Sequence, residues 1–261
     1  MSAPTTGRLI VATPPELVIH DALTPCPYLE GRTARLPLRL PVRALARSEF
    51  ETRLDVGDRR QGLLLYRTAC PDCVACEPIR IDVEQFQPGR TQRRVFRRGE
   101  LELRTEIGRL EPTAEKVNLY NRHKFGRGLN TGDQPIDLEG YRSFLGESCC
   151  DTFELRYRIG RKLVGLAIVD RSERALSAVY CFFDPGLGPL GIGTYSILKQ
   201  VDLCRQWGLR WLYLGLYIAE CPSMAYKSKF LPHERLLEGR WVTVDRPHAP
   251  AGEPTDSPND G

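Results

Sequence analysis

The order of elements between residues 153 and 218 constrains the fold most strongly. The segment "FELRYRIGRKLVGLAIVDRSERALSAVYCFFDP" predicts three consecutive strands, because apolar runs are separated by the turn sequences "IGRK" and "DRSER". After a glycine-rich turn, "GTYSILKQVDLCRQWGL" has apolar residues at helical spacing and predicts a helix that ends at Gly208. The run "RWLYLGLYI" predicts a buried strand. This order predicts an α+β fold, α/β-like in its C-terminal part, around a mixed sheet.

The preceding part of the chain has a different character. From about Leu9 to Ile81, short apolar runs are broken by Pro and Gly, with cysteines towards both ends. We expect a smaller, cysteine-containing N-terminal domain over residues 1–110 and the mixed sheet over residues 111–245. The segment 246–261, rich in Pro, Gly and acidic residues, predicts a disordered tail.

Charge and cysteine content limit the class of protein. There are 37 Lys and Arg against 33 Asp and Glu, and many basic residues cluster in the first half, which suggests an anionic partner. No stretch approaches eighteen apolar residues and no signal-peptide pattern is seen, so we expect no membrane association. Nine cysteines, an odd number, favour reduced thiols and a cytoplasmic location.

The glycine turn is the first candidate for chemistry. Gly186, Gly188, Gly191 and Gly193 stand between a strand and a helix start, where backbone N–H groups lack partners and can bind an anion or polarise a carbonyl. The order is similar to acetyltransferase-type folds, in which this turn receives the pyrophosphate of coenzyme A. No Arg or Gln just precedes the glycines to help hold a pyrophosphate. A glycine-rich surface loop is the alternative interpretation.

Three further segments carry candidate polar groups. "GRTQRRVFRR" predicts a helix with a basic stripe for phosphates, or else a solvated surface; the stripe is Arg90, Arg93, Arg94 and Arg97. "NLYNRHKFGRG" places His123 among cations, which lower the pKa of a histidine that acts as a base. Tyr226 and Lys227 follow the last buried strand, where loops of open sheets carry working groups; an ordinary exposed helix start is the alternative. No Ser–His–Asp order, HExxH motif or Walker-type loop is present.

The cysteines of "YRTACPDCVACEPIRI" allow two interpretations. Cys70, Cys73 and Cys76 supply three thiols, and Cys26 could complete a set of four for a structural zinc or an iron–sulfur cluster. Free cysteines also pack well as small apolar side chains. We slightly favour packing, and both interpretations stay open.

Several segments together resemble one family. "CPYLEGRTAR", "YRTACPDCVACEPIRIDVEQFQPGRTQRRVFRR", "LYNRH", "YCFFDP", "LGIGTYSILKQVDLCRQWGL", "YLGLYI" and "CPSMAYKSKFLPHE" resemble the bacterial aspartate/glutamate leucyltransferases, relatives of the eukaryotic arginyl-tRNA–protein transferases. The resemblance runs in order from about Cys26 to Glu234. It implies a cysteine-containing N-terminal domain followed by an acetyltransferase-like (GNAT-type) domain.

The resemblance also implies a reaction. Leucine passes from the 3′ ester of leucyl-tRNA to the N-terminal α-amine of a protein that begins with Asp or Glu, and the product carries a degradation signal (an N-degron). The ester is already activated, so no cofactor is required. The alternatives are arginyl transfer by the same mechanism, a coenzyme A-dependent N-acetyltransferase, and a non-catalytic zinc RNA-binding module.

Roles for individual residues follow from this implied reaction. An acidic first residue requires a cation to bind its carboxylate, and Arg gives a bidentate contact. The candidates for substrate binding are Arg80, Arg122 and Lys227, with Tyr120 beside Arg122 in the chain. The candidates for catalysis are Tyr226, to orient the ester or amine, His123, to accept a proton, and the helix start at Gly193 and Thr194. The tRNA would bind the stripe from Arg90 to Arg97.

Overall fold

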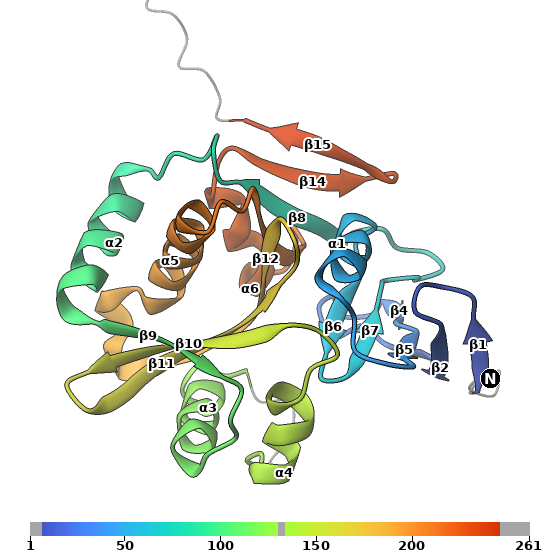
Figure 1. Ribbon diagram of the computed structural model, residues 1–261, viewed down its shortest axis with the longest axis horizontal. Helices are drawn as coiled ribbons and strands as arrows, with labels where there is room; N and C mark the ends of the chain where they lie inside the picture. Colours follow the sequence, from blue (N-terminus) through green and yellow to red (C-terminus); the bar gives the residue numbers. More distant parts are fainter. Residues whose placement is uncertain (1–6, 130–133, 246–261) are drawn as a thin grey trace, which may run out of the picture.

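The computed structural model describes residues 7–129 and 134–245, and it contains a large mixed sheet and a smaller sheet beside it (Figure 1). The predicted tail, 246–261, lies outside the described residues. The large sheet has eight strands in the order β15-β14-β8-β13-β12-β11-β10-β9. Their bounds are β8 Glu77–Asp82, β9 Arg104–Arg109, β10 Thr152–Ile159, β11 Lys162–Arg171, β12 Ala175–Phe183, β13 Trp211–Tyr217, β14 His233–Leu237 and β15 Arg240–Val244.

The predicted strand–helix–strand unit is at the centre of this sheet. Strands β9 to β12 are antiparallel neighbours, and β12 then pairs in parallel with β13. Parallel neighbours need a crossover, and helix α5 (Ile192–Gln206) supplies it. Gly208 follows α5 with a φ of 66°, as expected for a glycine that ends a helix. The predicted α+β class with a mixed sheet is confirmed.

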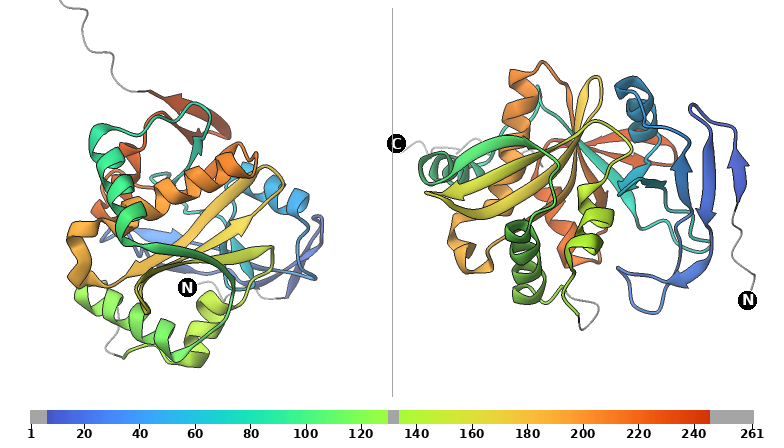
Figure 2. Two further views of the ribbon diagram at one scale, coloured as in Figure 1. Left: turned by 60° about the vertical axis from the view of Figure 1, so that its left-hand side comes forward. Right: turned by 60° about the horizontal axis from the view of Figure 1, so that its bottom comes forward.

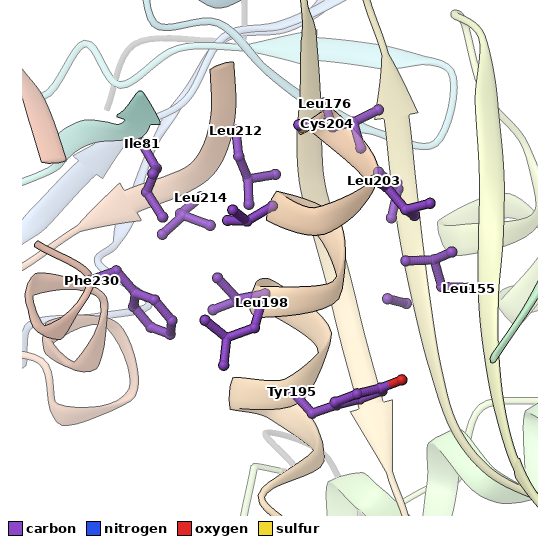
Figure 3. Close-up of a cluster of buried hydrophobic side chains, with 14 of the residues drawn as sticks. Ile81, Leu155, Leu176, Tyr195, Leu198, Leu203, Cys204, Leu212, Leu214 and Phe230 are labelled. Atoms are coloured by element: carbon purple, nitrogen blue, oxygen red, sulfur yellow. The ribbon is translucent and has the colours of Figure 1, made fainter. Parts of the chain in front are cut away.

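Helices cover both faces of the large sheet (Figure 2). On one face, α5 packs on the sheet and α2 (Arg90–Glu102) packs on α5. Leu198, Leu203 and Cys204 of α5 meet Leu155, Leu176, Leu212 and Leu214 of the strands (Figure 3). On the other face, α3 (Ala114–Gly126), α4 (Leu138–Tyr141) and the π-helical turn Arg142–Gly146 cover Leu163, Leu166 and Ile168. The strand side chains alternate between the two cores, as the pleat requires.

The smaller sheet is built from the start of the chain. Its order is β1-β2-β5-β7-β6, with a separate β3–β4 hairpin and helix α1 packed between the sheets. The bounds are β1 Arg8–Ile10, β2 Glu16–His20, β3 Leu23–Pro25, β4 Thr33–Arg35, β5 Leu38–Pro41, α1 Arg47–Asp55, β6 Arg59–Gln61 and β7 Leu64–Tyr66. A buried ion pair joins the sheets: Arg60 contacts both carboxylate oxygens of Asp170 at 2.8 Å.

Strands β8 and β9 precede residue 110 but belong to the large sheet. Ile79 and Ile81 of β8 are fully buried, and β8 pairs with β13 on one side and β14 on the other. The large sheet therefore takes strands from both sides of the expected boundary, and the division at residue 110 stays a prediction. No helix in the described ranges is long and apolar enough to cross a membrane.

Candidate active site

The parallel pair β12–β13 stays together for only part of its length. Pairing runs from Ala175 with Trp211 to Ser177 with Tyr213, although β12 continues to Phe183 and β13 to Tyr217. A β-bulge lies in β12 just beyond the last pair, because Ala178 and Tyr180 oppose consecutive residues of β11. We call residues 178–183 of β12 and 214–217 of β13 the unpaired ends. Backbone groups there face no strand partner across the parallel pair, and several of them bond side chains instead, as described below.

The glycine turn lies at the far end of β12. A short 3₁₀ segment, Pro185–Leu190, leads into Gly191, which has a φ of 64° and caps α5. The predicted groups Gly193 and Thr194 occupy the first turn of α5, where helical N–H groups have no intrahelical partner. A Cβ on Gly193 would lie 3.4 Å from the ring of Phe183, so the helix start adjoins the end of β12. The structure therefore brings these two donors to one end of the candidate site.

His123 contacts the backbone of Phe183 at the end of β12 from the protein interior. Its side chain is buried on α3, and Nδ1 lies 3.1 Å from the backbone N and 3.0 Å from the backbone O of Phe183. Burial lowers the pKa of His123, so the ring is neutral at pH 7. A neutral ring with an unprotonated Nδ1 accepts the Phe183 N–H. These contacts hold the end of β12, while the predicted role of His123 as a proton acceptor stays untested.

Lys227 and Tyr226 lie beside the unpaired end of β13. They follow α6 (Pro222–Ala225) in the 3₁₀ turn Tyr226–Lys229. Lys227 is buried, and its Nζ donates to the Leu216 carbonyl at 2.5 Å. Within the described ranges it has no carboxylate within 4.0 Å. Burial, and then the charge of Arg59, lower the pKa of Lys227 to about 7. Tyr226 is 41% exposed, and the centroid of its ring lies 5.9 Å from Nζ.

Arg59, which the sequence did not single out, reaches the same region from β6. Its guanidinium donates to Ser177 Oγ at 3.4 Å and to the Ala178 carbonyl at 3.2 Å. In the sequence "GDRRQG", adjacent arginines near two glycines indicate a surface turn. The local pattern therefore gives no sign that the Arg59 side chain is buried. Only the packing of β6 on β12 reveals it.

Three other predicted substrate-binding residues have partners of their own. Arg80 donates to Glu234 at 2.7 Å and to Asp55 at 3.0 Å, and its guanidinium lies between the rings of Trp211 and Trp241. Arg122 forms an ion pair with Asp184 at 3.4 Å.

Tyr120 packs in an aromatic cluster beneath the large sheet. Its ring lies 5.5 Å from that of Phe182 and 5.8 Å from that of Tyr180. Tyr120 therefore contacts the unpaired end of β12 through the core, and Arg122 binds Asp184, the residue after that end. The predicted roles of Arg80, Arg122 and Tyr120 in substrate binding stay predictions.

The predicted basic stripe lies on helix α2. Arg90, Arg93, Arg94 and Arg97 are exposed, and in the described part of the chain none has a carboxylate within 4.0 Å. The opposite face of α2 packs on α5, and Val95 lies 3.3 Å from the position of a Cβ on Gly191. Helix α2 therefore lies next to the glycine turn, and the stripe is on the exposed face of this helix.

The cysteines gather near the start of β8. Cys26, Cys73 and Cys76 pack with Leu29, Ile218 and Cys221 in one apolar cluster. Burial, and then the neighbouring thiols Cys26, Cys70 and Cys73, raise the pKa of the Cys76 thiol to about 12. Within the described ranges, no group of three or more His, Cys, Asp or Glu is arranged to hold a metal ion. Three of the four candidate thiols lie in this apolar cluster, and both interpretations, packing and a zinc or iron–sulfur site, stay predictions.

Known proteins are similar to this chain over most of its length. The sequence model of the family "arginine-tRNA-protein transferase, C terminus" matches residues 115–237. The sequence model of the corresponding N terminus matches residues 24–94. The chain is 39% identical to the aspartate/glutamate leucyltransferase of Chromobacterium violaceum over 84% of this chain and 90% of that protein. The chain belongs to the arginine-tRNA–protein transferase family.

Other members of this family are similar along nearly their whole length. The aspartate/glutamate leucyltransferase of Aeromonas hydrophila is 36% identical, over 88% of this chain and 97% of that protein. The counterpart from Gluconacetobacter diazotrophicus is 35% identical, over 90% of this chain and 91% of that protein. The chain is therefore an aminoacyltransferase, and the resemblance noted in the sequence is confirmed.

Proposed function

We propose that this aminoacyltransferase transfers leucine from leucyl-tRNA to the N-terminal α-amine of cytoplasmic proteins that begin with Asp or Glu. The observation that carries the proposal is the likeness to aspartate/glutamate leucyltransferases along 90% or more of their length. The site supports it, because buried Lys227, without a carboxylate partner, lies beside the unpaired end of β13. Leucylation of such proteins would create a degradation signal at the new N-terminus.

The proposed reaction requires no covalent enzyme intermediate. The neutral α-amine attacks the ester carbonyl of leucyl-tRNA, a C–N bond forms, the C–O bond to the tRNA 3′ oxygen breaks, and the amine proton passes to that oxygen. An α-amine with a pKa near 8 is partly neutral at pH 7. The main task of the protein is to hold amine and ester together, which can contribute about 7–11 kcal/mol. We expect backbone N–H groups of the unpaired end of β12 that have no side-chain partner to stabilise the oxyanion.

The site has a donor end and an acceptor end. The first turn of α5 lies at the Phe183 end of β12, and α2, with the stripe on its exposed face, packs beside the start of α5. We expect the first turn of α5 and the stripe to bind phosphates of the tRNA. Lys227 lies at the β13 end. Leucyl-tRNA would therefore approach along α2, and the acceptor peptide from the side of the small sheet.

A transfer assay with purified protein tests the proposal. The donors are leucyl-tRNA and arginyl-tRNA carrying a labelled amino acid, and the acceptors are peptides that begin with Asp, Glu, Ala or Lys. We expect label from leucyl-tRNA on the Asp and Glu peptides. Equal labelling of all four peptides, or none on the acidic ones, would refute the proposal, and label from arginyl-tRNA would favour arginyl transfer. Acetyl coenzyme A is the control donor, and a rise in melting temperature with it would favour the acetyltransferase alternative.

A further inference from the structure

Arg59 is a buried cation that extends from the small sheet to the unpaired ends. Besides its hydrogen bonds to Ser177 and Ala178 of β12, its Nη2 lies 3.0 Å from the position that a Cβ on Gly215 would take in β13. Gly215 has a φ of 88° and sits at a register shift between β13 and β8. The backbone of β13 thus bends where the guanidinium approaches, and a side chain at position 215 would crowd it.

The charge of Arg59 is not balanced within the described part of the chain. Four arginines are buried there, and Arg39, Arg60 and Arg80 each have a carboxylate within 3.0 Å. Arg59 has none within 4.0 Å, and nearby Asp170 already binds Arg60 through both oxygens. An uncompensated buried charge is strongly destabilising, so Arg59 does not stabilise this fold through an ion pair.

Lys227 adds a second cation at the same place. Its Nζ donates to Leu216, the residue after Gly215, so both cations converge on one short segment of β13. The charge of Arg59 also contributes to the lowered pKa of Lys227, as expected for two cations near the same segment. Burial also lowers the pKa of Arg59 itself. A pair of buried cations without an anion fits an anionic ligand.

We infer that Arg59 determines acceptor specificity by binding the side-chain carboxylate of the first acceptor residue, with Lys227 as the second positive neighbour. This inference rests on the proposed function and names the residue that selects Asp or Glu. A guanidinium presents parallel N–H donors that match both carboxylate oxygens, and it keeps its charge at any physiological pH. Bound there, the carboxylate would anchor the peptide beside the unpaired end of β12 and leave its α-amine free to reach the ester.

The test compares acceptors that differ only in charge. Wild type and variants are given peptides that begin with Asp or Asn, and with Glu or Gln, and kcat/KM is measured for each. The Asp-to-Asn ratio within one variant does not depend on the fraction of protein that is folded. In Arg59→Met and Arg59→Gln we expect this ratio to fall at least tenfold, about 1.4 kcal/mol, while Arg59→Lys retains part of it. An unchanged ratio in Arg59→Met overturns the inference.

Two controls separate the possible outcomes. Arg67→Gln removes a half-exposed arginine that contacts Val56 and Asp58, away from the unpaired ends, and it should keep the wild-type ratio. Arg59→Met should melt at or above the wild-type temperature, because it removes a buried charge and leaves no carboxylate without a partner. A lower melting temperature with an intact ratio would make Arg59 structural and overturn the inference. Wild-type protein that transfers leucine to no peptide would instead refute the proposed function.

Discussion

Replacing Gly99 by alanine is expected to destabilise the protein, although alanine ordinarily stabilises a helix. Gly99 lies in α2 where it crosses α5, and an added Cβ would stand 2.1 Å from Cδ2 and 2.5 Å from Cε2 of Tyr195. The Tyr195 ring is fully buried, and its hydroxyl is held by Glu100 at 2.7 Å and Thr105 at 2.8 Å. The ring therefore cannot swing away without breaking hydrogen bonds.

The two opposing effects have different sizes. Alanine in place of glycine inside a helix gains about 1 kcal/mol, whereas overpacking of a rigid core costs about 1–3 kcal/mol. Because the added atom would overlap two ring carbons, we take the upper end and expect a net loss of about 2 kcal/mol in the free energy of unfolding. To relieve the overlap, α2 would have to move away from α5. This movement would also shift the basic stripe and weaken tRNA binding.

Urea unfolding monitored by circular dichroism measures this loss. The matched control is Gly188→Ala, since an added Cβ at that position has no heavy atom within 4 Å. In a double-mutant cycle, Tyr195→Leu should recover part of the loss caused by Gly99→Ala, because it removes the ring that the methyl group meets. Equal or higher stability of Gly99→Ala would refute this account of how α2 docks.

Three further predictions concern charged side chains. Arg80→Met should cost about 2–4 kcal/mol of stability in urea unfolding, since it leaves Glu234 and Asp55 unpaired, while the Asp-to-Asn ratio stays within twofold of wild type. The pKa of Lys227 is about 7 in the folded protein and 10.5 ordinarily, so between these values the unfolded chain binds more protons. The free energy of unfolding should therefore rise with pH in this window, by at most about 1.4 kcal/mol per pH unit, and Lys227→Met should remove that rise. If the variant keeps the wild-type slope of unfolding free energy against pH, the prediction is wrong. Arg94→Gln and Arg97→Gln should each reduce the salt dependence of tRNA binding by about one in log–log slope, and a slope equal to that of wild type would exclude these side chains from phosphate contact.

Local sequence patterns predicted much of the fold. The apolar spacing of α5, the glycine at 208 and the strands on both sides are decided within short segments, and the structure agrees with each. The α2 helix was predicted because its basic residues recur at helical spacing, and its apolar face, with Val95 and Phe96, packs on α5. Such elements are predictable because neighbours in the sequence determine them.

The candidate site was only partly predictable, because its charges are set by contacts between distant segments. Arg80 in the sequence is as cationic as Arg59, and only the placement of Glu234, 154 residues later, distinguishes a paired arginine from an unpaired one. His123 was singled out for its basic neighbours, but its position is set by the backbone of Phe183, 60 residues away. Residue type and spacing do not indicate the ion pair of Arg80 with Glu234 or the hydrogen bond between His123 and Phe183.

The position of β8 between β13 and β14 limits how this protein can be divided. The strand comes early in the chain, yet both of its neighbours come more than 120 residues later. During synthesis, β8 must wait for most of the chain before its partners leave the ribosome, and its backbone groups stay without sheet partners until then. A gene fragment that began after residue 110 would lack a central strand rather than a detachable module. We therefore expect that recombination between related genes with a crossover near residue 110 yields poorly folded proteins, because β8 and its partners would come from different parents.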